Sequence, residues 1–340
     1  AILFLAGCGD GIDLPGVNVE TDLNKIPLPD NNVNLEQVEL KPSTEPMLHE
    51  GLHTEEDFQR IRDKKAAGEE PWVSAYQLLV ESQFSQKTAD TYPTEWIKRG
   101  VSGDENYMNA ARGASIAYQQ ALRWKIEQDD EYAAKAVENL NKWVQTCVGV
   151  TGNTNLSLAA GLYGYEFAIA GELLRDYGGW DRADFAAFQN WLLKVFYPAN
   201  DDFLKRHHDT NALHYWANWC LCNIAAKMAI GIVTDRRDIY NEGIAHLQTG
   251  DTNGRLRRAI YHDYAPDYNF AQWQESGRDQ GHTLMCVGLM GVICQLAWSQ
   301  GDDFFAYDDN LFLRACEYAA CCNYTNETVP YTTYIWQKQS

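Results

Sequence analysis

The sequence predicts an all-α protein, an incomplete (α/α) barrel or toroid built from antiparallel helical hairpins. Three observations lead to this prediction. Apolar residues recur at helical spacing over most of the chain after residue 71, strand-like alternation is scarce, and no motif repeats at a fixed length. A solenoid of stacked helix pairs would need such a repeat. A toroid, in which inner helices surround a cleft, therefore explains the pattern better.

About ten helices are expected, joined by loops rich in Gly, Asp and Asn. Thr54 begins the first, because its hydroxyl and the three acidic residues behind it suit the free N–H groups of a helix start. Gly281, Gly288 and Gly291 suit the close approach of inner helices. The clearest further helices are predicted at residues 106–127, 131–147, 156–177, 181–195, 211–231, 235–248, 279–299 and 309–323.

The N-terminal residues resemble the end of a bacterial signal peptide. Residues 1–8 read AILFLAGC, in which small residues precede Cys8 as in a lipobox. We therefore expect Cys8 to carry a lipid, residues 9–46 to form a flexible tether, and residues 47–340 to form the toroid domain. The expected location is the bacterial outer membrane, or the periplasm or extracellular space, with the lipid anchor as the only membrane contact.

Composition narrows the classes of partner. A net charge of -19 argues against nucleic acid, whose binding depends on Lys and Arg contacts to phosphate. The cysteines after Cys8 lie mostly in apolar helical runs without zinc-ligand spacing, so buried thiols are expected. No phosphate loop, dinucleotide fingerprint, serine elbow or metalloprotease motif is present. We expect a monomer without metal or cofactor.

The candidate site residues cluster in the second half of the chain. Six of the eight histidines lie between His207 and His282, together with the densest Lys and Arg. This local positive charge offsets the acidic average and suits an anionic ligand. Four polar segments stand out: His208, Asn211 and His214 ahead of one helix; Tyr261 to Tyr264; Glu275, Arg278, Gln280 and His282 ahead of another; and Asn155, which begins the helix that carries Tyr163.

Each of these groups also has a structural explanation. Asn211, His214 and Asn218 share one face if the segment is helical, and a histidine there can equally cap the helix or fill the core. Helix capping alone would also explain the position of Asn155. Arg278 and His282 would share a helical face, and such a density of polar groups requires a hydrogen-bond network or a ligand.

With these motifs the chain resembles the alginate lyase superfamily from about Met47 to its end, most closely polysaccharide lyase family 38. The matching segments are His53–Glu55 with Pro71–Trp72, Thr151–Tyr165, His214–Trp219, Gln272–His282 and Gln300–Asp303. More remotely, Asn211–Trp216 and Tyr261–Tyr264 are similar to the catalytic segments of family 5 alginate lyases, which are α/α toroids. Compared with these proteins, the chain stops short of the usual C-terminal part.

The resemblance implies β-elimination at a uronic acid of an acidic polysaccharide such as alginate or polyglucuronate. It implies Asn155, His214 and Arg278 as groups that neutralise the sugar carboxylate, and Tyr261 as base and then acid, with a pKa lowered by the nearby arginines. His208, Asn211, Tyr264, Glu275, Gln280, His282 and Tyr163 are expected to position the substrate.

Two positions leave alternatives open. The family 5 histidine aligns with Leu213, so His207, His208 or His214 is the imidazole; the family arginine aligns with Gly254, so Arg255, Arg257 or Arg278 takes its place.

Two other functions fit the same sequence. One is an inverting glycoside hydrolase on an α/α toroid, with Glu275 and Asp279 as acid and base. The other is a glycan-binding lipoprotein without catalytic activity, in which aromatic side chains hold the sugar.

Overall fold

The computed structural model describes residues 44–324 and 328–333 of the chain. Cys8 and the predicted tether up to residue 43 lie outside the described residues. The described elements are α1 (Glu55–Ala66), α2 (Trp72–Glu81), β1 (Trp96–Arg99), α3 (Tyr107–Glu127), α4 (Asp130–Thr146), β2 (Gly149–Gly152), α5 (Leu156–Leu173), α6 (Arg182–Val195), α7 (Tyr197–Arg206), α8 (Ala217–Val233), α9 (Arg237–Thr249), α10 (Leu256–Ala259), β3 (Ile260–Asp263), β4 (Ala271–Trp273), α11 (Gln280–Ser299) and α12 (Tyr307–Tyr324).

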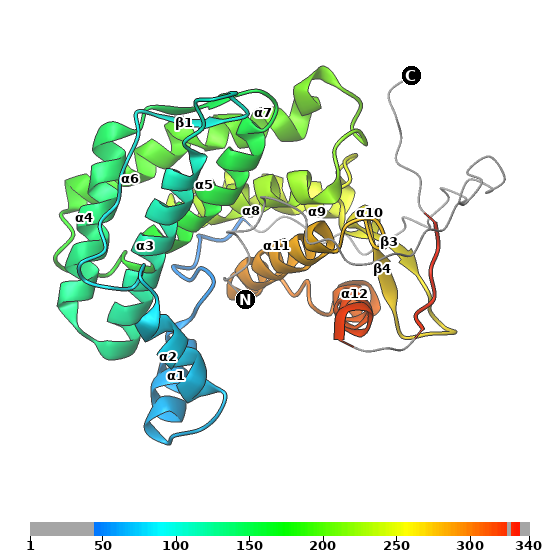
Figure 1. Cartoon of the computed structure of the whole chain (residues 1–340), viewed down its shortest axis with the longest axis horizontal. Coiled ribbons are helices and arrows are strands. Elements are labelled where there is room, and N and C mark those ends of the chain that lie inside the picture. The colour runs from blue at the N-terminus through cyan, green and yellow to red at the C-terminus, as the bar shows by residue number, and fades with distance from the viewer. Residues whose placement is uncertain (1–43, 325–327, 334–340) are drawn as a thin grey trace.

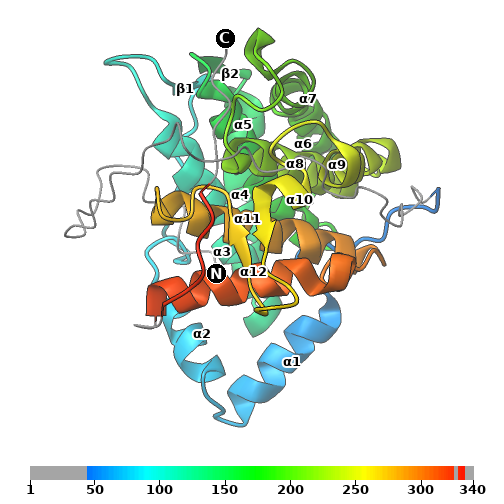
Figure 2. The same cartoon turned by 90° about the vertical axis from the view of Figure 1, so that its right-hand side faces the viewer.

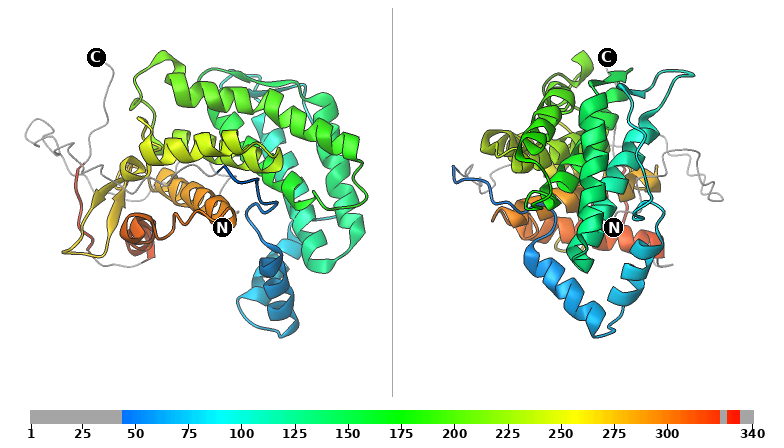
Figure 3. Two further views of the ribbon diagram at one scale, coloured as in Figure 1. Left: turned by 180° about the vertical axis from the view of Figure 1, so that it is seen from behind. Right: turned by 90° about the vertical axis from the view of Figure 1, so that its left-hand side faces the viewer.

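Four inner helices form an incomplete ring, as the sequence predicted. Helices α3, α5, α8 and α11 pack side by side in this order, and α4 and α9 return antiparallel along α3 and α8. Figure 1 shows α3 to α9 as a curved wall, with α11 and α12 across from α3. The α1–α2 hairpin projects from one end of this wall, which the side view also shows (Figure 2). The views from behind and from the left side show the same open ring (Figure 3).

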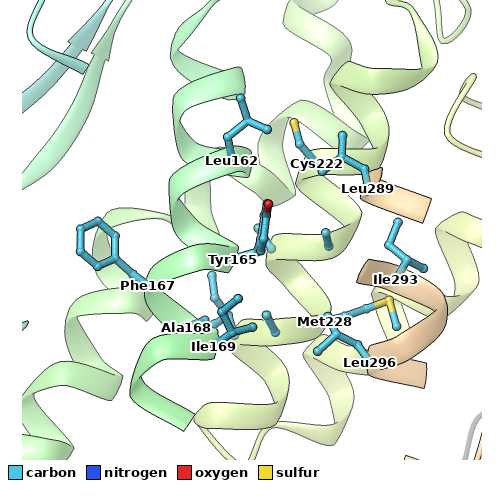
Figure 4. Close-up of a cluster of buried hydrophobic side chains, with 14 of the residues drawn as sticks. Leu162, Tyr165, Phe167, Ala168, Ile169, Cys222, Met228, Leu289, Ile293 and Leu296 are labelled. Atoms are coloured by element: carbon cyan, nitrogen blue, oxygen red, sulfur yellow. The ribbon is translucent and has the colours of Figure 1, made fainter. Parts of the chain in front are cut away.

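The inner helices run in the same direction. In α5, Leu162 lies beside Cys222 of α8, and one to two turns later Ile169 lies near Met228 (Figure 4). Leu289 of α11 is on the far side of α8, in the same apolar cluster. Helix α5 is buried on nearly every side, which explains why its sequence is apolar without a polar face. Leu296 of α11 lies near Met228, and Tyr107 at the start of α3 stacks on Tyr163 of α5, so the N-terminal ends of these four helices lie at one end of the ring.

Close helix contacts are made by glycines other than the predicted ones. A Cβ atom on Gly288 would meet nothing within 4 Å, and one on Gly291 would meet only Phe312 at 3.9 Å. The nearest atom to a Cβ on Gly281 would be the Asp279 carboxylate oxygen at 3.3 Å. The prediction for these three glycines of α11 was wrong, because they face open space or side chains. The close approach occurs at Gly161, between α5 and α8.

Replacing Gly161 by Ala should destabilise the protein. The new Cβ would lie 2.5 Å from the Cys222 Sγ and 2.9 Å from the Cys222 carbonyl carbon, so the two helices would have to separate. Overpacking of this kind costs about 1–3 kcal/mol of unfolding free energy. Gly288→Ala is the matched control and should be neutral or stabilising, because alanine favours helix. Chemical denaturation followed by circular dichroism measures both; equal midpoints for the two variants would contradict the contact.

The chain around residue 211 departs from the predicted helix. Helix α8 begins at Ala217, not at 211, and residues 212–215 form turns. The Asn253 side-chain amide donates to the carbonyl oxygens of Leu213 and Tyr215, at 3.0 and 2.8 Å, and so satisfies them outside a helix. Asn211, His214 and Asn218 therefore do not share a helical face. The sequence also gave no separate prediction for α7.

The cysteines and the apolar helix α11 complete the fold. All eight cysteines within the described residues are free thiols. Helix α11 has the length and mean hydropathy of a membrane-spanning helix. In the structure, 44% of its most apolar stretch is buried inside the protein. One of its faces packs on α8. Another lines a cavity that is described below.

Candidate active site at the N-terminal ends of the inner helices

The predicted site residues come from segments that meet at the N-terminal ends of α5, α8 and α11. Ser157, in the first turn of α5, and His208, just after α7, lie 2.9 Å apart through Oγ and Nε2. The Ala217 N–H, at the start of α8, donates to Gln274 Oε1 at 2.8 Å. Gln274 in turn lies next to β3, since its own N–H donates to the Ala259 carbonyl oxygen. Loops from four distant parts of the chain are thereby held together.

This end of the ring favours negative charge. The residues that cap α3, α5 and α8, namely Asn106, Asn155 and Trp216, make no side-chain capping hydrogen bond. In α11, Asp279 accepts from the His282 N–H. Each helix N-terminus carries about half a positive charge, so parallel helices create an anion-attracting surface. The acidic chain thus has one end suited to a polyanion.

Asn155 and Tyr163 lie on α5. The Asn155 side-chain amide donates to Asn153 Oδ1 at 2.9 Å, and Asn155 itself is partly exposed. Tyr163 is buried two turns into the helix, and its ring stacks on Tyr107 of α3 with 6.5 Å between the centroids. Asn155 is therefore accessible to a ligand at the helix end, whereas Tyr163 supports the wall beneath it.

Arg99 is a functional candidate that the sequence analysis missed. It is buried with 9% of its surface exposed, and its Nη1 has no hydrogen-bond partner. Among the described residues no carboxylate forms an ion pair with it, and its guanidinium lies over the Tyr107 ring at 4.7 Å. Strand β1 places it opposite Gly152 of β2, just before Asn155. An unpaired buried guanidinium is costly unless a ligand completes its hydrogen bonds.

The β1–β2 pair depends on Gly152. This residue has φ of +143°, and a Cβ atom there would lie 1.8 Å from the Arg99 carbonyl oxygen. Only glycine permits this approach. The short parallel pair therefore fixes Arg99 beside the start of α5.

The three candidate histidines differ in their surroundings. His207 is buried against Phe203, and burial lowers its pKa. Burial also lowers the pKa of His208, whose Nε2 is bonded to Ser157 Oγ, so His208 ties α7 to α5 as a neutral imidazole. His214 is partly exposed, and its ring lies 4.9 Å from that of Tyr215. Asn211 is exposed, and its Oδ1 accepts from the Leu213 N–H.

Tyr261 and Tyr264 lie beside the C-terminal segment of the described chain. The Tyr261 hydroxyl donates to the Thr333 carbonyl oxygen at 3.4 Å. The Tyr264 hydroxyl donates to Gln272 Oε1 at 2.6 Å and contacts Thr332. Burial, followed by the neighbouring tyrosines, raises the pKa of Tyr261 above its usual value.

The expectation of a lowered Tyr261 pKa was therefore wrong, because burial and the neighbouring tyrosines dominate its surroundings and no arginine offsets them. Arg257 pairs with Asp308 and, at 3.7 Å, with Asp263. Arg258 donates to the Asp251 carbonyl oxygen. Arg255 precedes the short helix α10 and is buried, and its Nε has no hydrogen-bond partner among the described residues.

The turn before α11 contains the remaining predicted residues. Glu275 is fully buried in a left-handed conformation with φ of 69°, and burial raises its pKa. Arg278 pairs with Glu275 and lies over the Trp216 ring at 4.7 Å. His282 Nδ1 lies 2.6 Å from the Asp279 carboxylate. Because α11 begins at Gln280, Arg278 precedes the helix, and the predicted shared face with His282 was wrong. Gln280 is partly exposed at this helix start.

Within residues 44–324 and 328–333, no three His, Cys, Asp or Glu side chains are grouped closely enough to hold a metal ion. The polar groups that meet at this end include amides, imidazoles, phenols and guanidinium groups, and the Glu275 and Asp279 carboxylates there pair with Arg278 and His282. Such groups can bind an anionic oxygen and move a proton.

Comparison with known proteins identifies the family. The alginate lyase family model matches residues 61–327. A histidine-to-alanine variant of alginate lyase A1-III in complex with a tetrasaccharide has a TM-score of 0.61 at 14% identity, over 80% of this chain and 78% of that one. Alginate lyase A1-III from Sphingomonas species A1 gives 0.55 at 13% identity, over 82% and 80%. An alginate lyase from Bacteroides ovatus gives 0.52 at 14%, over 78% and 81%.

A search of curated protein sequences found no match. The solved structures share the α/α toroid, and the family model covers most of the length of the chain. The chain therefore belongs to the alginate lyase family and is a polysaccharide lyase with an incomplete α/α toroid fold.

Proposed function

We propose that the chain cleaves a uronic-acid polysaccharide, alginate or polyglucuronate, by β-elimination at the N-terminal ends of the inner helices. A base removes the proton from C5 of the uronic acid, a C4–C5 double bond forms, and the bond from C4 to the glycosidic oxygen breaks. The leaving oxygen takes up a proton, and no water is consumed. The membership of polysaccharide lyase family 38 stays a prediction.

The observation that carries this proposal is the unpaired Arg99 at a converging set of helix N-termini. The C5 proton is weakly acidic while the adjacent carboxylate is ionised, so the enzyme has to stabilise the negative charge that develops there. Arg99 has no competing carboxylate among the described residues. Arg278, by contrast, already pairs with the buried Glu275. We therefore assign carboxylate neutralisation to Arg99 together with Asn155 and His214, and a supporting role to Arg278.

Tyr261 is the proposed base and acid. Its hydroxyl is protonated at neutral pH, because burial raises its pKa, and this form can donate to the leaving oxygen. To act first as base, it must lose its proton when the substrate binds. His208 is engaged with Ser157 and is better suited to positioning α5 and α7 than to proton transfer.

This assignment predicts that the activity rises with pH. The phenolate fraction increases about tenfold per pH unit as long as the pH is below the tyrosine pKa. Because the Tyr261 pKa is raised, kcat/KM should increase throughout the range from about pH 6 to about pH 9. Initial rates on alginate in buffers of constant ionic strength measure this. A maximum near neutrality would argue for an imidazole as base instead.

One assay separates the proposed lyase from its alternatives. The protein is incubated with alginate, polyglucuronate and a neutral glycan, while ultraviolet absorbance and reducing ends are followed together. A lyase produces both signals in equal amounts, because each cleavage creates one conjugated double bond. A hydrolase using Glu275 and Asp279 would produce reducing ends alone, and a binding protein would produce neither signal.

A further inference from the structure

A cavity away from the proposed active site lies between the α1–α3 side of the ring and helices α11 and α12. Its volume is about 560 Å³, and it is open to solvent. In Figure 1, α11 and α12 stand across from α3 and the α1–α2 hairpin, which is where the ring is incomplete. The side formed by α11 is apolar and includes Met285, Leu289 and Val292. Phe312 of α12 extends this apolar surface.

The opposite side of the cavity carries a small set of polar groups. His53 Nε2 and the Tyr118 hydroxyl lie 2.5 Å apart and satisfy each other. Burial lowers the His53 pKa and raises that of Tyr118, so both are uncharged at neutral pH. Asp57 and Arg60 form an ion pair with each other. These four side chains therefore give this side of the cavity hydrogen-bonding groups but no net charge.

Among the described residues that line the cavity, Glu166 has a buried polar atom without a partner. It lies on α5, it is 5% exposed, and its Oε2 is buried without a hydrogen bond. Burial raises its pKa to about 8, so the side chain is a neutral carboxylic acid at pH 7. Such an acid offers one donor and one acceptor. A buried polar atom that lacks a partner normally indicates a missing ligand or water.

This cavity is distinct from the site of β-elimination. Glu166 follows Asn155 by eleven positions in α5, which corresponds to roughly 16 Å along the helix axis. A polyuronate is unsuited to the cavity, because its carboxylates would lose their hydration against an apolar wall that offers no free cation among the described residues.

We propose that this cavity is a second binding site for an uncharged, largely apolar small molecule with one hydroxyl group, which is held by Glu166. The apolar part of the ligand packs on α11 and Phe312, and its hydroxyl exchanges hydrogen bonds with the Glu166 carboxylic acid. The proposal is independent of the reaction assigned to the other site.

Three matched probes test the chemistry of the ligand. These are 4-propylphenol, propylbenzene and 4-propylbenzoate, which share a ring and a tail but differ in the polar group. Ligand-observed NMR titration of the wild-type protein at pH 7 gives the dissociation constants. The phenol should bind at least about fivefold more tightly than propylbenzene, the gain from one hydrogen bond of ordinary strength, and the benzoate should bind most weakly. Equal affinities for the phenol and propylbenzene would overturn the role of Glu166.

Two variants test the place of binding. Gly288 lines the cavity, and a Cβ there meets nothing within 4 Å, so Gly288→Phe fills the space without displacing the backbone. It should abolish binding of the phenol, whereas Gly178→Phe, an equally open glycine outside the cavity, should not. Unchanged binding in Gly288→Phe would overturn the site.

Glu166→Leu should keep the affinity for propylbenzene and lose the preference for the phenol, and Glu166→Gln should retain that preference. Circular dichroism confirms folding, and Glu166→Met, which also removes both oxygen atoms, replaces the leucine variant if that variant does not fold. If the variant without the two oxygen atoms keeps the preference for the phenol, the assignment of Glu166 is wrong. Alginate cleavage should be unchanged in Gly288→Phe, so a loss of binding is distinguishable from a failure of the proposed lyase function.

Discussion

The Tyr261→Phe variant is expected to lose at least about 10²-fold in kcat, because it removes the only group proposed both to accept the C5 proton and to protonate the leaving oxygen. The change deletes one oxygen atom and, with it, the hydrogen bond to the Thr333 carbonyl oxygen. Initial rates from the ultraviolet signal on alginate measure the loss.

Tyr268→Phe is the matched control for this variant. Tyr268 lies in the loop between β3 and β4, seven positions after Tyr261, and is 53% exposed. It should retain wild-type turnover. If Tyr261→Phe also retains it, the proton is transferred by another group, and His214 becomes the first alternative to test.

Replacing Arg99 by Met should lower kcat/KM by about 10²–10³-fold, the effect of removing one donor that stabilises developing negative charge. Methionine keeps the apolar stem beside Tyr107 and removes the charge. Because the interaction strengthens as the carbanion forms, kcat should fall together with kcat/KM. Arg99→Lys should be more active than Arg99→Met, because lysine restores the positive charge. It should remain less active than the wild type, because an ammonium group lacks the planar pair of donors of a guanidinium.

Lys98→Ala provides the control for Arg99. Lys98 is the preceding residue of β1, but it pairs with the exposed Asp104 at the surface. Its removal should change the rate by no more than about twofold, since surface ion pairs contribute little. A similar loss in both variants would show that β1, and not the Arg99 charge, matters for activity.

The sequence predicted the helices better than it predicted the site. Apolar spacing located α3, α5 and α11 closely, because burial imposes the helical period on these segments. The start of α8 was misplaced, because the carbonyl groups of residues 213 and 215 bond to Asn253, which lies about 40 positions further along. No local pattern can show such a partner.

The same limitation explains the missed Arg99 and the reversed pKa of Tyr261. Arg99 acquires its position from the β1–β2 pairing, which joins segments about 50 residues apart. The short alternation of residues 96–99 was the only local signal for it. The arginines near Tyr261 seemed unpaired in the sequence, but Asp308 of α12 neutralises Arg257. A cluster of like charges in the sequence therefore overstates the local electrostatic potential when residues far along the chain pair with those charges in the fold.

The common direction of the four inner helices has a consequence for how the enzyme captures its substrate. With backbone N–H groups at one end and carbonyl groups at the other, the ring is electrically polarised along its axis. A chain with a net charge of -19 repels a polyanion from most directions. Productive encounters should therefore begin at one face, and added salt should weaken both the repulsion and this guidance.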